Sequence, residues 1–157
     1  MSLFEGKPAP DFSLQGTDGK THKIQDYRGK TLIIYFYPRD DTPGCTKESC
    51  GFRDIKTDLD KLDTIILGIS KDSLASHDAF ISKFDLPFVL LSDPATSMMQ
   101  TYGAWGEKKL YGKVSIGCIR STLVIDPTGM VIKRWPKIKN AVDHPAEVLE
   151  FLKDREG

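Results

Sequence analysis

Two cysteines five residues apart, Cys45 and Cys50, are the residues of this sequence best suited to covalent chemistry. Cys45 follows Thr42-Pro43-Gly44, which is typical of a helix start, because threonine is a good N-cap and proline is tolerated at the first helical position. The free N–H groups and positive dipole end of such a start favour an anion, and the thiolate is the reactive form of cysteine. Cys45 is therefore predicted to be a reactive thiol, although a structural cysteine in an ordinary strand–turn–helix fits the same local sequence.

Cys50 is expected in the same helix, and helix geometry limits its pairing with Cys45. Five residues give a rise of about 7.5 Å and a net rotation of about 140°, which separates the two Cα atoms by roughly 8.7 Å. A disulfide without backbone movement needs Cα atoms within roughly 7 Å. A Cys45–Cys50 disulfide would thus require the first helical turns to unwind. Otherwise the thiols never pair, and Cys50 packs as a small hydrophobe.

Arg120 is the third candidate, because it lies in the apolar segment Ile119 to Asp126, which we predict to be a strand. Arginine is rarely buried without an anionic partner, and a thiolate at the end of a neighbouring strand would be one. The alternative is an edge position with the guanidinium in water. Cys118, two residues earlier, is expected on the same strand face. A buried hydrophobe is the favoured interpretation of Cys118, and a functional third thiol the other.

The histidines give no sign of a metal site. His22, His77 and His144 are scattered, and none has metal-ligand spacing with a cysteine pair. A Cys-x4-Cys motif alone is a poor zinc motif. We therefore expect neither a metal nor a cofactor.

Short apolar runs predict the strands that position these residues. Four of them read as buried core strands, spanning residues 31–37, 64–70, 88–91 and 119–126. Turn residues between shorter runs predict hairpins at residues 11–24 and 119–135. The glycine-rich segment from Gly103 to Gly117 is expected to be a loop over one end of the sheet. It carries Trp105 and Tyr111, for which core packing or surface contact is as good an interpretation as a place beside the site.

Helical spacing of apolar residues predicts the remaining elements. One helix is expected to run from Cys45 through Leu62, and others at residues 73–84, about 95–102, and from Asp143 onward. Strands that alternate with helices, followed by a hairpin and a last helix, are typical of a three-layer α/β fold with a mixed sheet. The length of 157 residues suits one domain over residues 1–157.

Composition excludes several classes of function. The 22 basic residues balance the 22 acidic ones, so nothing points to nucleic acid or to a membrane surface. No apolar run approaches the roughly 20 residues that span a bilayer. The N-terminus lacks the pattern of a secretory signal. Three cysteines are too few for a disulfide scaffold and favour a reducing compartment, so we expect a cytoplasmic protein.

Pro38-x-x-x-Thr42-x-x-Cys45 resembles the active-site signature of peroxiredoxins. The wider match covers residues 36–54 and the block from Arg120 to Asp126, and it is similar to the bacterioferritin comigratory protein (peroxiredoxin Q) branch. It extends from Gly6 to the last helix, nearly the whole chain. The resemblance implies a thioredoxin-like three-layer sandwich with a central mixed sheet and an N-terminal β-hairpin, and it suggests a monomer.

The resemblance also implies an activity, that of a thiol peroxidase. The Cys45 thiolate would attack hydrogen peroxide or an alkyl hydroperoxide and become a sulfenic acid. Cys50 would then condense with it to an intramolecular disulfide. Thioredoxin, or a similar dithiol reductant, would restore both thiols.

Four more residues receive roles by the same resemblance. Thr42 would contact the Cys45 sulfur and the peroxide, and as N-cap its hydroxyl can also accept from the Cys45 N–H. Pro38 would shield the thiolate from water, and first-turn N–H groups, among them Gly44, would hold the peroxide oxygens. Arg120 would help to ionise Cys45 and polarise the peroxide.

Glu48 also matches the pattern. It either orients arginine side chains or is a solvated helix residue.

Two other functions stay open at this point. One is a thiol–disulfide oxidoreductase on the same fold, which normally carries Cys-x-x-Cys. The Cys-x4-Cys spacing and Arg120 argue against it. The other is a non-catalytic redox sensor, which turnover with a reductant would distinguish from an enzyme.

Overall fold

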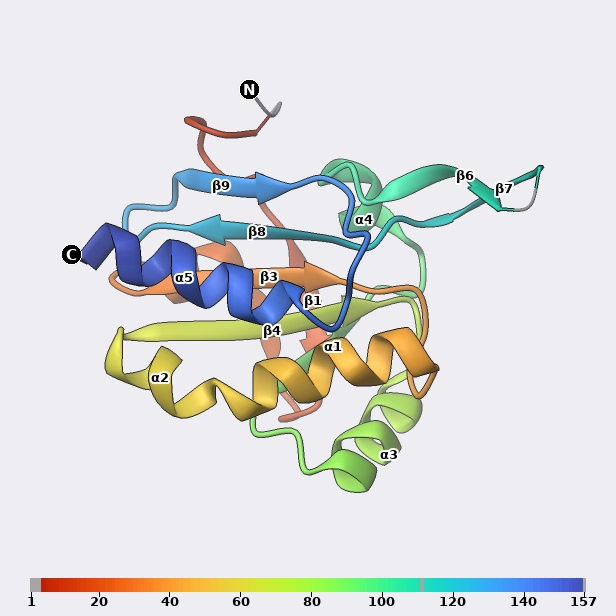
Figure 1. Cartoon of the computed structure of the whole chain (residues 1–157), viewed down its shortest axis with the longest axis horizontal. Coiled ribbons are helices and arrows are strands. Elements are labelled where there is room, and N and C mark those ends of the chain that lie inside the picture. Colours follow the sequence, from red (N-terminus) through yellow and green to blue (C-terminus); the bar gives the residue numbers. More distant parts are fainter. Residues whose placement is uncertain (1–3, 111, 157) are drawn as a thin grey trace.

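A seven-stranded mixed sheet forms the centre of the computed structural model, which describes residues 4–110 and 112–156 (Figure 1). The strand order is β2-β1-β5-β4-β3-β8-β9. The strands are β1 (Ser13–Gly16), β2 (Thr21–Lys23), β3 (Thr31–Phe36), β4 (Thr64–Ser70), β5 (Val89–Ser92), β8 (Ser121–Ile125) and β9 (Val131–Trp135). β3, β4 and β5 are parallel to one another, and the other pairings are antiparallel.

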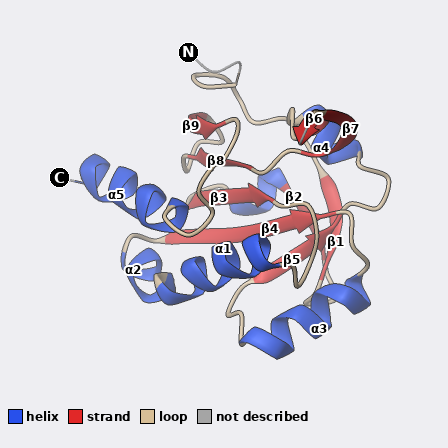
Figure 2. Ribbon diagram, turned by 45° about the vertical axis from the view of Figure 1, so that its right-hand side comes forward, coloured by secondary structure: helices blue, strands red, loops and turns tan. Residues whose placement is uncertain are grey.

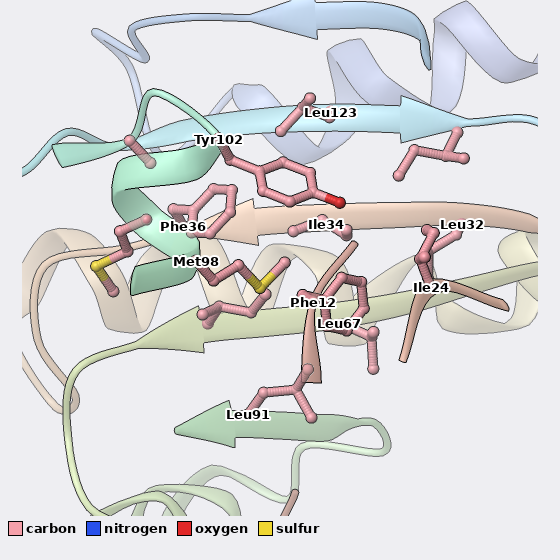
Figure 3. Packing of buried hydrophobic residues seen from close by; sticks show 14 of the residues in the cluster. Phe12, Ile24, Leu32, Ile34, Phe36, Leu67, Leu91, Met98, Tyr102 and Leu123 are labelled. Atoms are coloured by element: carbon pink, nitrogen blue, oxygen red, sulfur yellow. The ribbon is translucent and has the colours of Figure 1, made fainter. Parts of the chain in front are cut away.

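Strand β3 explains why the sequence shows an unbroken apolar run there. Its side chains alternate between the two faces of the sheet, and both faces are buried. Leu32, Ile34 and Phe36 belong to the core on one face, which Figure 3 shows together with Tyr102 of the covering layer. Ile33 and Tyr35 belong to the core on the other face. β3 therefore holds both outer layers in place.

Helices cover the two faces unequally (Figure 2). One face packs against α1 (Pro43–Asp54), α2 (Lys56–Lys61), α3 (Leu74–Phe84) and α5 (His144–Glu156). The other face is covered by α4 (Ser97–Thr101), the short 3₁₀ helix Ile24–Tyr27 and the N-terminal segment. The predicted three-layer α/β fold with an N-terminal hairpin is confirmed. None of the helices in residues 4–110 and 112–156 combines the length and the hydropathy of a bilayer-spanning segment.

Helix α1 begins where the sequence predicted it but ends earlier. Thr42 has the extended backbone of an N-cap, and Pro43 is the first helical residue. The expectation that the helix continues unbroken through Leu62 is wrong. At Ile55 the backbone leaves helical geometry, with φ −104° and ψ 7°, and the chain resumes as α2. Helical spacing of the apolar residues persists across this break, so the pattern alone did not reveal it.

The segment predicted to be a loop is a β-hairpin instead. Strands β6 (Trp105–Leu110) and β7 (Lys113–Cys118) pair antiparallel as a separate sheet that projects from the body (Figure 1). Gly112, with φ +78°, lies at its turn. The many glycines and lysines hid these strands in the sequence, because backbone pairing rather than an apolar pattern forms the hairpin. Tyr111 lies outside the described residues.

The hairpin also corrects the expected relation of Cys118 and Arg120. Cys118 ends β7, whereas β8 begins at Ser121, so Arg120 lies in the link between two different sheets. The inference that both side chains occupy one strand face is therefore wrong. Backbone hydrogen bonds hold this link: Ile119 N–H donates to Ala104 O at 2.7 Å, and Ile138 N–H donates to Arg120 O at 2.8 Å.

Candidate active site

Cys45 occupies the first turn of α1, beyond the carboxyl end of β3, and only 1% of it is exposed. The helix begins with the hydrogen bond from Thr46 N–H to Thr42 O at 2.8 Å. One turn further on, the hydroxyls of Ser49 and Tyr35 are 2.9 Å apart, which fixes the helix against the sheet. Cys45 is thus a buried thiol whose place is set by both the helix start and the core beneath it.

Arg120 joins Cys45 to Glu48. Its Nη2 donates to Cys45 Sγ at 3.2 Å, and its Nη1 donates to Glu48 Oε1 at 2.8 Å. The predicted contact between Arg120 and the thiol is confirmed, and 17% of the arginine side chain remains exposed. Burial opposes the charge of Arg120, but the negative charges of Glu48 and Cys45 outweigh it and raise the pKa of the guanidinium. A permanent cation therefore faces the sulfur.

Gly44 makes room for this cation. A Cβ atom at Gly44 would lie 3.2 Å from Arg120 Nη2, closer than ordinary van der Waals contact. The missing side chain lets the guanidinium approach the first turn of α1. This explains why a glycine suits position 44, which the sequence context alone did not show.

Glu48 is fully buried, so the solvated alternative for it is wrong. Its Oε2 has no hydrogen-bond partner among the described residues. Burial raises the pKa of Glu48 to about 7, even though the positive charge of Arg120 opposes that shift. Glu48 orients Arg120 through Nη1 while Nη2 contacts the sulfur, and its own protonation changes the charge of the cluster near neutral pH.

Thr42 differs from the expected cap. The prediction that its hydroxyl accepts from the Cys45 N–H is wrong, since α1 has no side-chain capping bond. The Thr42 hydroxyl donates instead to Arg39 O at 3.0 Å, which closes the loop between β3 and α1. No hydrogen bond joins it to the Cys45 sulfur among the described residues.

The other two cysteines have different surroundings. All three thiols are free; Cys50 is half-buried in α1, and Cys118 is buried at 4% exposure. Burial raises the pKa of Cys118 to about 12, with Lys108 opposing the shift. The raised pKa favours the protonated form of Cys118 at neutral pH, which fits the interpretation as a space-filling hydrophobe.

A second polar cluster, which the sequence analysis missed, surrounds Asp40. Tyr37 donates to Asp40 Oδ1 at 2.6 Å, and Ser76 donates to Oδ2 at 2.8 Å. His77 Nδ1 lies 2.7 Å from Oδ2, while the Asp40 N–H donates to Asp72 Oδ2 at 2.8 Å. The bonds to Ser76 and His77 cross 36 and 37 residues, so no local signal could have found them.

The tautomer of His77 follows from its two neighbours. Its Nε2 lies 2.9 Å from Leu91 O, and a carbonyl only accepts, so Nε2 carries a hydrogen. The other ring nitrogen and the Asp40 carboxyl must then share a proton across their 2.7 Å contact. Asp40, Asp72 and His77 are close enough to hold a metal ion, and in this structure hydrogen bonds use Asp40 Oδ2, Asp72 Oδ2 and His77 Nδ1.

His144, like His77, is buried, and it lies beside the site. Its Nε2 lies 2.8 Å from the Thr122 hydroxyl, and burial, with the nearby charge of Arg120, lowers the pKa of His144 to about 4. His144 is therefore neutral at physiological pH, and its ring packs edge-on against Phe52 and Trp135.

A cavity of about 270 Å³ opens beside the cluster. Pro38 and Arg120 line it, so its wall includes the cation that contacts the sulfur. The arrangement of a buried thiol, a cation on the sulfur and an adjacent cavity suits nucleophilic attack by sulfur on a small electrophile.

Comparisons with known sequences point to one family. The sequence profile of the AhpC/TSA family matches residues 6–134. Peroxiredoxin Bcp of Bacillus subtilis (strain 168) is 46% identical over 154 residues, covering 98% of each chain. A putative peroxiredoxin bcp of Coxiella burnetii is 47% identical over 153 residues, covering 97% of this chain and 100% of the relative.

Solved structures agree with the sequence comparisons. A cysteine-to-serine mutant of PrxQ from Xylella fastidiosa superposes with a TM-score of 0.92 at 30% identity, covering 100% of this chain and 99% of that chain. Bacterioferritin comigratory protein of Xanthomonas campestris, studied for its alkyl peroxide reduction activity, gives a TM-score of 0.87 at 36% identity. That match covers 93% of this chain and 92% of the other.

Proposed function

Because the chain belongs to the AhpC/TSA family and is a peroxiredoxin, a thiol-dependent peroxidase, we propose that Cys45 is the sulfur that attacks the peroxide. The observation that carries this assignment is the 3.2 Å hydrogen bond from Arg120 Nη2 to Cys45 Sγ. A partly buried cation beside one thiol stabilises its thiolate, whereas Cys118 lies buried with its pKa raised to about 12. Of these two buried cysteines, we therefore assign the reaction to Cys45.

The proposed first step is an in-line displacement. The Cys45 thiolate attacks the terminal oxygen of a hydroperoxide, a sulfur–oxygen bond forms and the oxygen–oxygen bond breaks. Sulfur is oxidised to a sulfenic acid, and the leaving oxygen departs as hydroxide or alkoxide that takes up a proton from solvent. Arg120 and the first-turn N–H groups, including that of Gly44, stabilise the charge on the leaving oxygen. Pro38 keeps water away from the sulfur.

Cys50 is the proposed resolving thiol. It attacks the sulfur of the Cys45 sulfenic acid and releases water, leaving a disulfide within one chain. Both cysteines lie in α1, where ideal helix geometry separates their Cα atoms by roughly 8.7 Å, too far for a disulfide. The first turns of α1 must therefore unwind, and the Arg120–Cys45 contact must break. Reduced and oxidised crystal structures that superpose through residues 42–52, with the disulfide formed, would refute this step.

The cycle closes with an external dithiol, for which we propose thioredoxin or a similar protein. Thiol–disulfide exchange returns both cysteines to the reduced form and leaves the donor as a disulfide. Reactive thiols persist in a reducing compartment, which supports a cytoplasmic location. We further propose that the chain works as a monomer of one domain.

Hydrogen peroxide consumption with thioredoxin, thioredoxin reductase and NADPH tests these assignments. We expect steady NADPH oxidation by the wild type, none by Cys45→Ser, and a single turnover by Cys50→Ser that stops at the sulfenic acid. Continued turnover by Cys50→Ser would assign resolution to Cys118 or to an external thiol. Peroxide-dependent oxidation that survives in Cys45→Ser would contradict the assignment of the nucleophile.

A further inference from the structure

The cavity beside Arg120 carries more positive charge than the reaction with hydrogen peroxide requires. Three lysines line it, Lys108, Lys109 and Lys137, together with Arg120. Glu107 is the single acidic residue of the lining. The formal charge of the lining is thus +4 − 1 = +3, in a chain whose formal net charge is zero.

These lysine charges are not cancelled by close partners. Within the described part of the chain, none of the three lysines forms an ion pair with a carboxylate within 4.0 Å. Arg120, by contrast, is already paired with Glu48 and the sulfur. An anion entering the cavity would therefore meet uncompensated ammonium groups rather than the catalytic guanidinium.

Two contacts place the segments that carry these lysines beside the site. Ile138 N–H donates to Arg120 O at 2.8 Å, which ties the segment carrying Lys137 to the arginine of the site. On the hairpin, Lys108 Cδ lies 3.5 Å from where a Cβ of Gly117 would stand. Lys108 pairs with Ser115, so its stem leans across Gly117 toward the base of the hairpin, where Cys118 and Arg120 follow. The segments that carry Lys108 and Lys137 are thus part of the cavity wall beside Arg120.

Part of the lining is apolar. Pro38, Ile119 and Ile138 complete the wall together with the charged residues. A cavity with apolar walls and a few convergent charges suits an amphipathic ligand, whose carbon part contacts the wall and whose charge meets the lysines. Hydrogen peroxide has neither feature.

We propose that this cavity binds the organic part of hydroperoxides that carry a carboxylate, so that the enzyme prefers them over uncharged hydroperoxides of the same size. The inference rests on the proposed function, since the peroxide group must reach Cys45 while the carboxylate lies among Lys108, Lys109 and Lys137. The reaction itself is unchanged: the Cys45 sulfur takes the terminal oxygen, and the carboxylate-bearing alcohol leaves.

A matched pair of substrates tests the preference. The probes are 4-hydroperoxy-4-methylpentanoic acid and its methyl ester, which share the reacting group and differ in charge. Second-order rate constants for both are measured by stopped flow, each normalised to the rate with hydrogen peroxide. Dithiothreitol is the reductant, so no protein partner can contribute to the effect of the lysines. We expect the acid to react faster than the ester, and the ratio to fall as salt rises, because ions screen exposed charges.

Charge variants locate the effect. Lys108→Met and Lys137→Met keep the apolar stem and remove the ammonium, and each is expected to lower the acid-to-ester ratio roughly two- to fivefold. Glu107→Gln is expected to raise the ratio. Lys153→Met is the matched control, because exposed Lys153 lies near the C-terminal end of α5, across the molecule from the hairpin (Figure 1). It makes the same change in net charge and should leave the ratio unchanged.

The outcomes separate this inference from the proposed function. A ratio near one in the wild type, with hydrogen peroxide still consumed, would overturn the carboxylate site alone. So would an equal fall of the ratio in Lys153→Met and Lys137→Met. If the wild type failed to consume hydrogen peroxide with any thiol donor, both proposals would be overturned together.

Discussion

The cluster around Cys45 and the cluster around Asp40 are both buried and both place a carboxylate beside a basic side chain, but their hydrogen bonds differ. Asp40 has Tyr37, Ser76 and His77 as partners, and His77 is itself bonded at both ring nitrogens. In the other cluster Glu48 Oε2 has no partner among the described residues. Arg120, which contacts the Cys45 sulfur, also lines a cavity.

This difference indicates that the buried charges of the Asp40 cluster serve stability, whereas those of the Cys45 cluster serve chemistry. A fully bonded network stabilises one arrangement and leaves no group free to change partners. An incompletely bonded cluster leaves charge available to a substrate, at a cost in stability that the rest of the fold must offset. We therefore expect changes in the Cys45 cluster to act on rate and changes in the Asp40 cluster to act on stability.

The largest expected effect is that of Arg120→Met. Removing the cation that faces the sulfur should lower the rate constant for Cys45 oxidation by hydrogen peroxide roughly a hundred- to a thousandfold, as loss of an oxyanion donor does in other enzymes. Stopped-flow measurement at neutral pH gives this rate. Arg134→Met is the matched control, because Arg134 is also partly buried but contacts Gly103 O and the Phe4 ring. Similar losses of rate in both variants would contradict the distinction between the clusters.

Asp40→Asn should show the reverse pattern. It removes the negative charge from a buried pair in which His77 is fully buried, and it should lower the free energy of unfolding by about 3 kcal/mol. The rate per folded molecule should change by less than roughly threefold, because no Asp40 atom hydrogen-bonds the sulfur or Arg120. Urea denaturation and stopped flow on the same sample measure both. A stable variant that has lost its rate would assign Asp40 to the chemistry instead.

Glu48→Gln should change how stability depends on pH. Burial raises the pKa of Glu48 from 4.5 to about 7, so the folded state binds this proton more tightly than the unfolded state. The stability that Glu48 contributes is then present below pH 4.5 and is lost as the pH rises through about 7. In Glu48→Gln this loss, on the order of 1 kcal/mol or more, should vanish.

His144 gives the opposite slope, since its lowered pKa makes stability fall as the pH drops from 6.5 through about 4. Subtracting the variant's urea-denaturation profile from that of the wild type therefore isolates Glu48. Parallel profiles for the two proteins would mean that the pKa of Glu48 is the same in the folded and the unfolded state.

The smallest expected effect is that of Gly44→Ala. The new Cβ would stand 3.2 Å from Arg120 Nη2 and push the guanidinium away by a few tenths of an ångström. The rate with hydrogen peroxide should fall roughly three- to tenfold. Gly51→Ala is the same change in the same helix, but its Cβ would meet Pro145 Cγ at 2.7 Å. It should cost stability and leave the rate alone, and a larger loss of rate than in Gly44→Ala would contradict this account.

Local chemistry made much of this structure predictable from sequence. The run of residues 31–37 and the start of α1 at Pro43 depend on neighbouring residues, and both were predicted. The hydrogen bonds of Asp40 with His77 and of Glu48 with Arg120 join residues 37 and 72 positions apart, so their existence depends on how the layers pack. The break at Ile55 was hidden because apolar spacing continues across it. The hairpin of β6 and β7 was hidden because its stability comes from backbone pairing rather than an apolar face.

The most direct test of the central claim is to locate the oxygen after one equivalent of hydrogen peroxide. In Cys50→Ser, where the first product cannot form the Cys45–Cys50 disulfide, peptide mass spectrometry after sulfenic acid trapping identifies the oxidised residue. We predict one modification on Cys45 and none on Cys118, because only Cys45 contacts a cation through its sulfur among these two buried thiols. A modification on Cys118 with Cys45 unmodified would contradict it.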